Sequence, residues 1–134
     1  MDDANRIPKK SRHICLTIYL ILLVGGNALF AFAYLFLIPV MRQTAPTFPV
    51  LGFPMLSALH TVNLLCAIAL WRWKMAGFFG YALSTILIAA VQLFGGLGIL
   101  TALSGLASIA LLYAILQMGD TNKGWPQLEM PQRP

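Results

Sequence analysis

Charge is scarce in this sequence. Only 10% of its 134 residues are charged and 59% are hydrophobic, whereas a soluble domain carries roughly 25% charged residues. Small soluble domains bury the smallest fraction of their surface, so a soluble chain of this size would leave much of its apolar area in water. The shortage of charge therefore predicts a protein whose solvent is lipid.

Acidic residues are absent from every long apolar stretch. The only ones, Asp2, Asp3, Asp120 and Glu129, lie near the ends of the chain, and no long apolar stretch contains lysine or arginine. Proton-coupled transporters and pumps generally need an ionisable group inside the membrane. Small multidrug transporters, which have a similar length, depend on a glutamate embedded there. The sequence therefore excludes both classes.

Motifs that carry chemistry are scarce as well. Cys15 and Cys66 are too few for a disulfide framework, and we expect both to behave as small hydrophobic residues. Ser57 and His60 are three residues apart, but no carboxylate is available to orient them for nucleophilic catalysis. No cluster of Cys and His has metal-ligand spacing, and the glycine-rich segment 95–98 lacks the lysine of a phosphate loop. We expect no catalytic residue, no metal site and no enzymatic activity.

Four apolar segments are long enough to cross a membrane. A helix needs about 20 residues to span the hydrocarbon core, and the segments cover 15–40, 53–71, 75–94 and 99–118. Prolines mark 41–52 as a connection along the membrane interface, and the glycines of 95–98 divide the last two spans. The fold class is therefore predicted to be all-α, a single-domain integral membrane four-helix bundle with polar tails over 1–13 and 119–134.

The basic residues predict the orientation of these spans. If the N-terminus is cytoplasmic, eight of the nine basic residues lie on the cytoplasmic side and only Arg42 lies outside, as the positive-inside rule requires. The eight are Arg6, Lys9, Lys10, Arg12, Arg72, Lys74, Lys123 and Arg133. Both termini are then cytoplasmic. Because no basic stripe with interleaved aromatic residues exists, we expect no nucleic-acid partner.

Aromatic and basic residues at the ends of the spans are predicted to lie in the headgroup layer, where amphipathic side chains settle. These interface anchors are Trp71, Arg72, Trp73, Lys74 and Trp125. For the tail around Trp125, a docking peptide for a partner is the alternative. The scattered tyrosines are expected to anchor at the interface too.

Small residues are spaced to form helix-packing faces. Residues three or four apart are neighbours on a helix, and close backbone approach drives helix association in lipid. The predicted helix-packing residues are Gly25, Ala28 and Ala31 in the first span and Ala76, Gly80 and Ser84 in the third. Ser104 and Ser108 form a smaller set in the fourth span.

Three polar side chains stand out inside the spans. Asn27 and Asn63 lie roughly 18 Å and 15 Å along their helices, near the bilayer midplane. An unpaired amide there is costly, so each is predicted to pair with the other amide or with a neighbouring backbone group. His60 lies about 10 Å deep. It is either hydrogen-bonded to a neighbouring helix or water, or an axial ligand of a chlorophyll-type pigment or haem. We otherwise predict no cofactor.

Several pieces of the C-terminal half carry a resemblance. Segment 71–78 reads Trp-Arg-Trp-Lys-Met-Ala-Gly-Phe, and the further pieces are 103–106, 111–113 and 122–129. Together they resemble a group of small bacterial four-span proteins, whose third span starts Trp-x-Trp-Lys-x-x-Gly-x-x-Gly and whose short tail contains Trp and Leu-Glu. The resemblance implies a four-span protein of the bacterial inner membrane and brings no activity with it.

Three functions remain open from the sequence. The first is a non-enzymatic accessory or assembly subunit of a larger bacterial membrane protein complex, whose partners are the lipid bilayer and other membrane subunits. The second is a pigment- or haem-binding light-harvesting or electron-transfer component using His60. The third is a small neutral-solute or lipid-handling membrane protein with a polar pocket around Asn27, His60 and Asn63.

Overall fold

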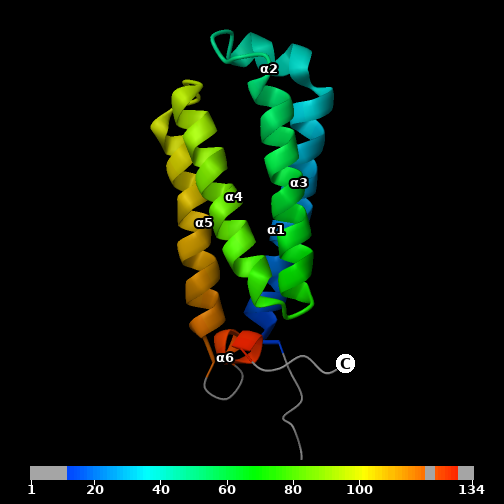
Figure 1. Cartoon of the computed structure of the whole chain (residues 1–134), viewed down its shortest axis with the longest axis vertical. Coiled ribbons are helices and arrows are strands. Elements are labelled where there is room, and N and C mark those ends of the chain that lie inside the picture. The colour runs from blue at the N-terminus through cyan, green and yellow to red at the C-terminus, as the bar shows by residue number, and fades with distance from the viewer. Residues whose placement is uncertain (1–11, 120–122, 130–134) are drawn as a thin grey trace, which may run out of the picture.

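The computed structural model describes residues 12–119 and 123–129, and all regular structure within them is helical (Figure 1). The elements are α1 (Ile14–Phe36), α2 (Ile38–Thr44), α3 (Gly52–Trp71), α4 (Met75–Phe94), α5 (Ile99–Gln117) and α6 (Gly124–Glu129). Helices α1, α3, α4 and α5 are each long and apolar enough to cross a membrane. Such lengths and compositions are those of a multi-pass membrane protein.

The first long helix is shorter than the segment 15–40 predicted from the sequence. It ends at Phe36, and Leu37 separates it from α2, which has a proline in its first turn. Within a continuous helix, Pro39 would clash with the carbonyl of Leu35 and remove a hydrogen bond. Near the start of a new helix the same proline fits without loss. The connection 41–52 is correspondingly part helix, since α2 extends to Thr44.

The other long helices lie within one residue of the predicted segments, and α4 covers the same residues as the third. A turn over residues 95–98 separates α4 from α5. Gly96 and Gly98 have φ angles of 81° and 95° there, a region that favours glycine. The amide of Leu97 donates to the carbonyl of Gln92 at 2.9 Å and closes the end of α4.

The long helices pack in the order α1, α3, α4, α5. Helix α3 packs extensively against both α1 and α4, and α4 also packs against α5, whereas α1 and α5 meet only sparsely. Figure 1 shows α2 over one end of this arrangement and α6 across the other end, beneath α5 and α1. The seam between α1 and α5 is thus the least closed side of the molecule.

Each end of the molecule is filled by a cluster of buried apolar side chains. The α6-end cluster consists of Leu16, Leu20, Leu23, Ala67, Leu70, Phe78, Tyr81, Leu112, Leu116 and Leu128. The α2-end cluster consists of Tyr34, Phe48, Phe53, Leu56 and Ile88. In the second cluster, the Phe48 ring from the connection lies where a Cβ on Gly52 or Gly95 would be. The absence of side chains at these two glycines lets the connection close over α3 and α4.

Only some of the predicted helix-packing residues lie between helices of this chain. Gly25 and Ala28 are exposed or open on the outer face of α1, whereas the Ala31 carbonyl accepts a hydrogen bond from Ser57 at 2.7 Å. On α4, Ala76 is exposed. The close contact there is made by Gly77, where a Cβ would come within 2.7 Å of the Cys66 carbonyl oxygen.

Gly80 and Ser84, the other two predicted packing residues of α4, do face α3. At Gly80 a Cβ would come within 2.7 Å of the Cys66 sulfur, and Ser84 donates a hydrogen bond to Asn63. The structure therefore places Gly77, Gly80 and Ser84 against α3, and it does not place Gly25, Ala28 or Ala76 between helices. Both cysteines are free thiols.

The predicted interface anchors gather at the α6 end. The guanidinium of Arg12 lies 4.8 Å from the ring centre of Trp71 and 5.5 Å from that of Trp73, a cation–π arrangement. Arg72 and Lys74 are exposed beside them. Trp125 of α6 instead packs edge-on against other rings, 5.1 Å from Phe78 and 5.4 Å from Tyr113 between ring centres. The tail therefore folds back onto α4 and α5.

Candidate functional site

A cavity lies between the four long helices, in the section between the two apolar clusters. Its volume is about 280 Å³, and all four helices contribute to its lining. Leu23 and Tyr81 border it from the α6-end cluster, and Tyr34 and Ile88 border it from the α2-end cluster. Ten of the 16 lining residues have polar side chains, and none is acidic, lysine or arginine. The polar members are Asn27, Tyr34, His60, Asn63, Tyr81, Thr85, Gln92, Thr101, Ser104 and Ser108.

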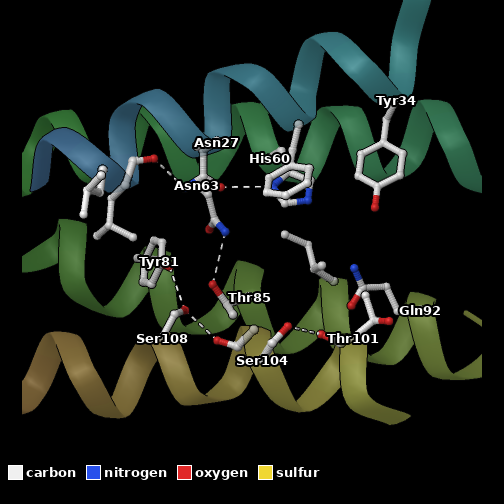
Figure 2. Close-up of a pocket in the computed structure, with 16 residues that line it drawn as sticks. Asn27, Tyr34, His60, Asn63, Tyr81, Thr85, Gln92, Thr101, Ser104 and Ser108 are labelled. Atoms are coloured by element: carbon white, nitrogen blue, oxygen red, sulfur yellow. Dashed lines mark hydrogen bonds between the residues drawn. The ribbon is translucent and has the colours of Figure 1, made fainter. Parts of the chain in front are cut away.

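Regular helical spacing produces this column of polar side chains (Figure 2). On α4, Tyr81, Thr85 and Gln92 follow one another at intervals of four and seven, so they share one face. On α5, Thr101, Ser104 and Ser108 do the same at intervals of three and four. The two faces meet across the cavity because α4 and α5 are antiparallel neighbours joined by a short turn.

His60 and Asn27 form a hydrogen bond from α3 to α1 inside this cavity. The Asn27 amide nitrogen donates to the Leu23 carbonyl at 2.8 Å, which leaves the Asn27 oxygen facing His60. That oxygen lies 3.0 Å from Nδ1 of His60, so Nδ1 must carry the proton and donate. The neutral imidazole then presents Nε2 as an acceptor. The rings of Phe30 and Tyr34 flank it, with ring centres at 5.2 Å and 5.5 Å.

Asn63 joins α3 to α4. Its amide nitrogen donates to the Thr85 hydroxyl at 3.1 Å, and its oxygen accepts from the Ser84 hydroxyl. The sequence predicts pairing of the two asparagines with each other or with backbone. The structure gives Asn27 a backbone carbonyl, which was one of these alternatives, and also a histidine. It gives Asn63 two hydroxyl groups, which were not predicted. Each amide thus has hydrogen-bond partners, as its burial in an apolar interior requires.

Ser108 forms the floor of the cavity toward the α6 end. Its hydroxyl donates to the Gly105 carbonyl at 2.5 Å, so the Tyr81 hydroxyl donates to Ser108, with 2.8 Å between the oxygens. The Tyr19 hydroxyl donates to the Ser108 carbonyl at 2.9 Å. One serine of α5 therefore receives hydrogen bonds from α1 and α4. The expectation that Tyr81 anchors at the interface is wrong, because its side chain is only 3% exposed.

Two buried acceptors of the cavity lining have no hydrogen-bond donor within the described chain. They are Nε2 of His60 and Oε1 of Gln92. The side chains are 9% and 5% exposed, so bulk water does not satisfy them. A buried acceptor without a donor costs about 1–3 kcal/mol. Within residues 12–119 and 123–129, the other buried side-chain polar atom without a hydrogen-bond partner is Nε of Arg12, which lies at the α6 end and not in the cavity.

The structure brings together Asn27, His60 and Asn63, the three residues singled out in the sequence. It adds Tyr34, which was expected to anchor at the interface, and Gln92, which lies two residues before the end of the third predicted segment. Thr85 and Thr101 carried no prediction at all. The available signal was the recurrence of uncharged polar residues at helical spacing in two otherwise apolar segments.

No protein-family model, curated protein or solved structure matched this chain. The resemblance of the C-terminal half to small bacterial four-span proteins therefore remains a prediction, and the functional argument rests on the cavity itself.

Proposed function

We propose that this protein binds a small neutral solute, or the uncharged polar part of a lipid, in the cavity between its four long helices. The observation that carries the proposal is the cavity's lining, in which ten of the 16 residues have polar side chains and none is acidic, lysine or arginine. Binding sites are concave and place a few polar groups among apolar ones. Neutral hydrogen-bonding groups recognise a neutral ligand, because an ion there would be desolvated without an opposite charge. The proposed role is non-enzymatic.

We further propose that the protein is a four-helix bundle of the bacterial inner membrane and that both of its termini are cytoplasmic. Among the described residues, Arg12, Arg72, Lys74 and Lys123 belong to the end at which α6 lies, and Arg42 of α2 belongs to the opposite end. Basic residues accumulate on the cytoplasmic side of membrane proteins. This distribution supports an α6 end that faces the cytoplasm.

The geometry favours a small ligand over a tetrapyrrole pigment. The His60 tautomer is the one that metal-bound histidines adopt, in which the N–H of the other ring nitrogen donates a hydrogen bond. However, the cavity of about 280 Å³ is at the lower limit of the roughly 300–1,000 Å³ typical of sites for drug-sized ligands. A macrocycle at His60 would have to displace Phe30 and Tyr34, which flank the ring.

Co-purification tests the proposal. Wild-type protein is extracted with its surrounding lipid in polymer nanodiscs, and small molecules are identified by mass spectrometry. His60→Leu and Gly105→Leu, which alter the cavity lining, are compared with His13→Gln outside it. We expect an uncharged compound that is retained by wild type and His13→Gln and is depleted in both cavity variants. Absence of any such compound would contradict the proposal.

The same preparation separates the other two functions. A visible absorption band that disappears in His60→Leu would identify a pigment or haem component. Stoichiometric co-purifying protein chains would identify an accessory or assembly subunit, whose contact faces would include the exposed Gly25 and Ala28 of α1.

A further inference from the structure

The exposed part of the cavity lining lies on one side of the molecule only. Every lining residue from α3 and α4 is buried. The exposed lining residues are Leu22 and Phe30 of α1 and Thr101 and Ser104 of α5. Leu22 is 64% exposed and Phe30 is 49% exposed. Because α1 and α5 also meet only sparsely, the mouth of the cavity is the α1–α5 seam.

This mouth opens sideways from the helices and extends from the middle of α1 to the first turn of α5. Leu22 lies more than two helical turns from Ile14 and Phe30 lies six residues from Phe36, whereas Thr101 lies two residues from Ile99. The α6-end and α2-end clusters fill the interior above and below the cavity. In a membrane, the hydrocarbon of the bilayer therefore lies outside the mouth, and a ligand enters from the lipid.

The interior of the cavity selects the chemistry of the group that enters. His60 Nε2 and Gln92 Oε1 are acceptors that lack a donor. A hydroxyl group donates one hydrogen bond and accepts others, so it can supply a donor to one of these acceptors. Ethers, esters and ketones only accept, and would leave both atoms unsatisfied. A carboxylate or phosphate would bring a charge that no lining residue neutralises.

We infer that the ligand is a neutral lipid with a hydroxyl headgroup, which enters through the α1–α5 seam and donates its hydroxyl proton in a hydrogen bond to Nε2 of His60 while its apolar chain stays in the bilayer. The inference rests on the proposed function and specifies the ligand's chemical class and its route. Volume agrees with it, because a cavity of about 280 Å³ holds a headgroup and leaves a long chain outside.

Photo-crosslinking in nanodiscs of phosphatidylcholine tests the inference. The probe is a hexadecanol that carries a diazirine in its chain, and the matched probes are its methyl ether and the corresponding fatty acid. Labelled peptides are quantified by mass spectrometry. We expect the alcohol to label α1 and α5 beside the seam, at residues near Phe30 and Ser104. Labelling by the ether should be lower by roughly 3-fold to 18-fold, the value of one hydrogen bond in a membrane protein.

Two pairs of variants separate the mouth from the headgroup site. Ser104→Leu adds bulk to an exposed lining residue, and Ala110→Leu adds the same bulk at an exposed position outside the lining. Ser104→Leu should abolish labelling at the seam and Ala110→Leu should leave it unchanged. His60→Leu should reduce labelling by the alcohol to the level of the ether, whereas His13→Gln should have no effect.

Each outcome bears on the inference. Equal labelling by alcohol, ether and acid would overturn the hydroxyl headgroup, and equal effects of Ser104→Leu and Ala110→Leu would overturn the lateral route. Because Ser104 is exposed, its variant keeps the test valid even if His60→Leu does not fold. If the alcohol fails to label while an uncharged compound co-purifies with wild type, this inference fails and the proposed function stands. If neither binds, both fail.

Discussion

Nδ1 of His60 in α3 lies 3.0 Å from the side-chain oxygen of Asn27 in α1. Asn27 is itself fixed by its donation to the Leu23 carbonyl, so the pair has a single direction of hydrogen bonding. That direction decides which nitrogen of His60 faces its surroundings as an acceptor. An asparagine of one helix thus sets the chemistry of a histidine on another.

Asn27→Leu should lower the stability of the protein and allow His60 to adopt either imidazole tautomer. Loss of one interhelical hydrogen bond in a membrane protein costs about 0.6–1.7 kcal/mol, which would appear as a lower melting temperature in detergent. In His13→Gln protein labelled with ¹⁵N-histidine, wild-type His60 should show a single Nδ1–H tautomer, and Asn27→Leu should show a mixture. Thr61→Val is the control, because that exposed hydroxyl bonds only within its own helix. A single unchanged tautomer would contradict the assigned geometry.

Asn63→Leu should destabilise the contact between α3 and α4. It removes the partner of both the Thr85 and Ser84 hydroxyls, so the expected loss is about 1–3 kcal/mol for two interhelical bonds. Equilibrium unfolding in mixed micelles measures the difference. A melting temperature equal to that of wild type would show that the amide does not join these helices.

Gly77→Ala should destabilise the protein, whereas Gly25→Ala should not. A Cβ at Gly77 would come within 2.8 Å of the Leu70 backbone nitrogen, and at Gly25 it would meet nothing within 4 Å. Forcing the α3 backbone away costs about 1–3 kcal/mol. Alanine in an open helical position gains up to about 1 kcal/mol over glycine. Thermal unfolding of the pair should therefore give shifts of opposite sign, and equal shifts would contradict the packing of α4 on α3.

Arg12→Ala should weaken the α6 end of the molecule. The guanidinium contacts the rings of Trp71 and Trp73 and donates to the Trp71 carbonyl, and cation–π contacts contribute about 0.5–2 kcal/mol. Arg72→Ala removes an exposed charge of the same sign and serves as the control. Tryptophan fluorescence should shift in Arg12→Ala at temperatures below global unfolding. Identical spectra for the two variants would show that Arg12 makes no such contact.

Single cysteines test the orientation. In a Cys15→Ser, Cys66→Ala background, Thr47→Cys and Lys123→Cys place thiols at exposed positions beyond opposite ends of the long helices. With cytoplasmic termini, a membrane-impermeant maleimide should label residue 47 in intact cells and residue 123 only after permeabilisation. The reverse pattern would invert the proposed orientation.

Hydropathy located the long helices because the thickness of a bilayer imposes a minimum run of about 20 apolar residues. The same signal placed the end of the first long helix at residue 40, whereas α1 ends at Phe36. Residues 37–41 are apolar, so hydropathy continues through them, and the break comes from the ring of Pro39. The short helix α6 escaped prediction because six residues hold too few turns for a periodic pattern to emerge.

Asn27, His60 and Asn63 could be found in the sequence because amides and imidazoles are costly in lipid. Thr85 could not, and Ser108 was predicted only as a helix-packing residue, since hydroxyl groups in helices commonly bond to their own backbone and give no comparable penalty. The rotation of each helix about its axis was also undetermined. Spacing alone therefore did not distinguish Gly77, which contacts α3, from Ala76, which faces outward.

The two apolar clusters have an electrical consequence. Hydroxyl and imidazole groups such as those of the cavity relay protons when a file of hydrogen-bonded water molecules connects them to both sides of the membrane. Here Leu20, Leu112 and Leu116 interrupt such a file on one side, and Phe53 and Leu56 on the other, each at most 1% exposed. A planar bilayer containing the protein should therefore keep the resistance of a protein-free bilayer, and cells that produce it should retain their proton gradient.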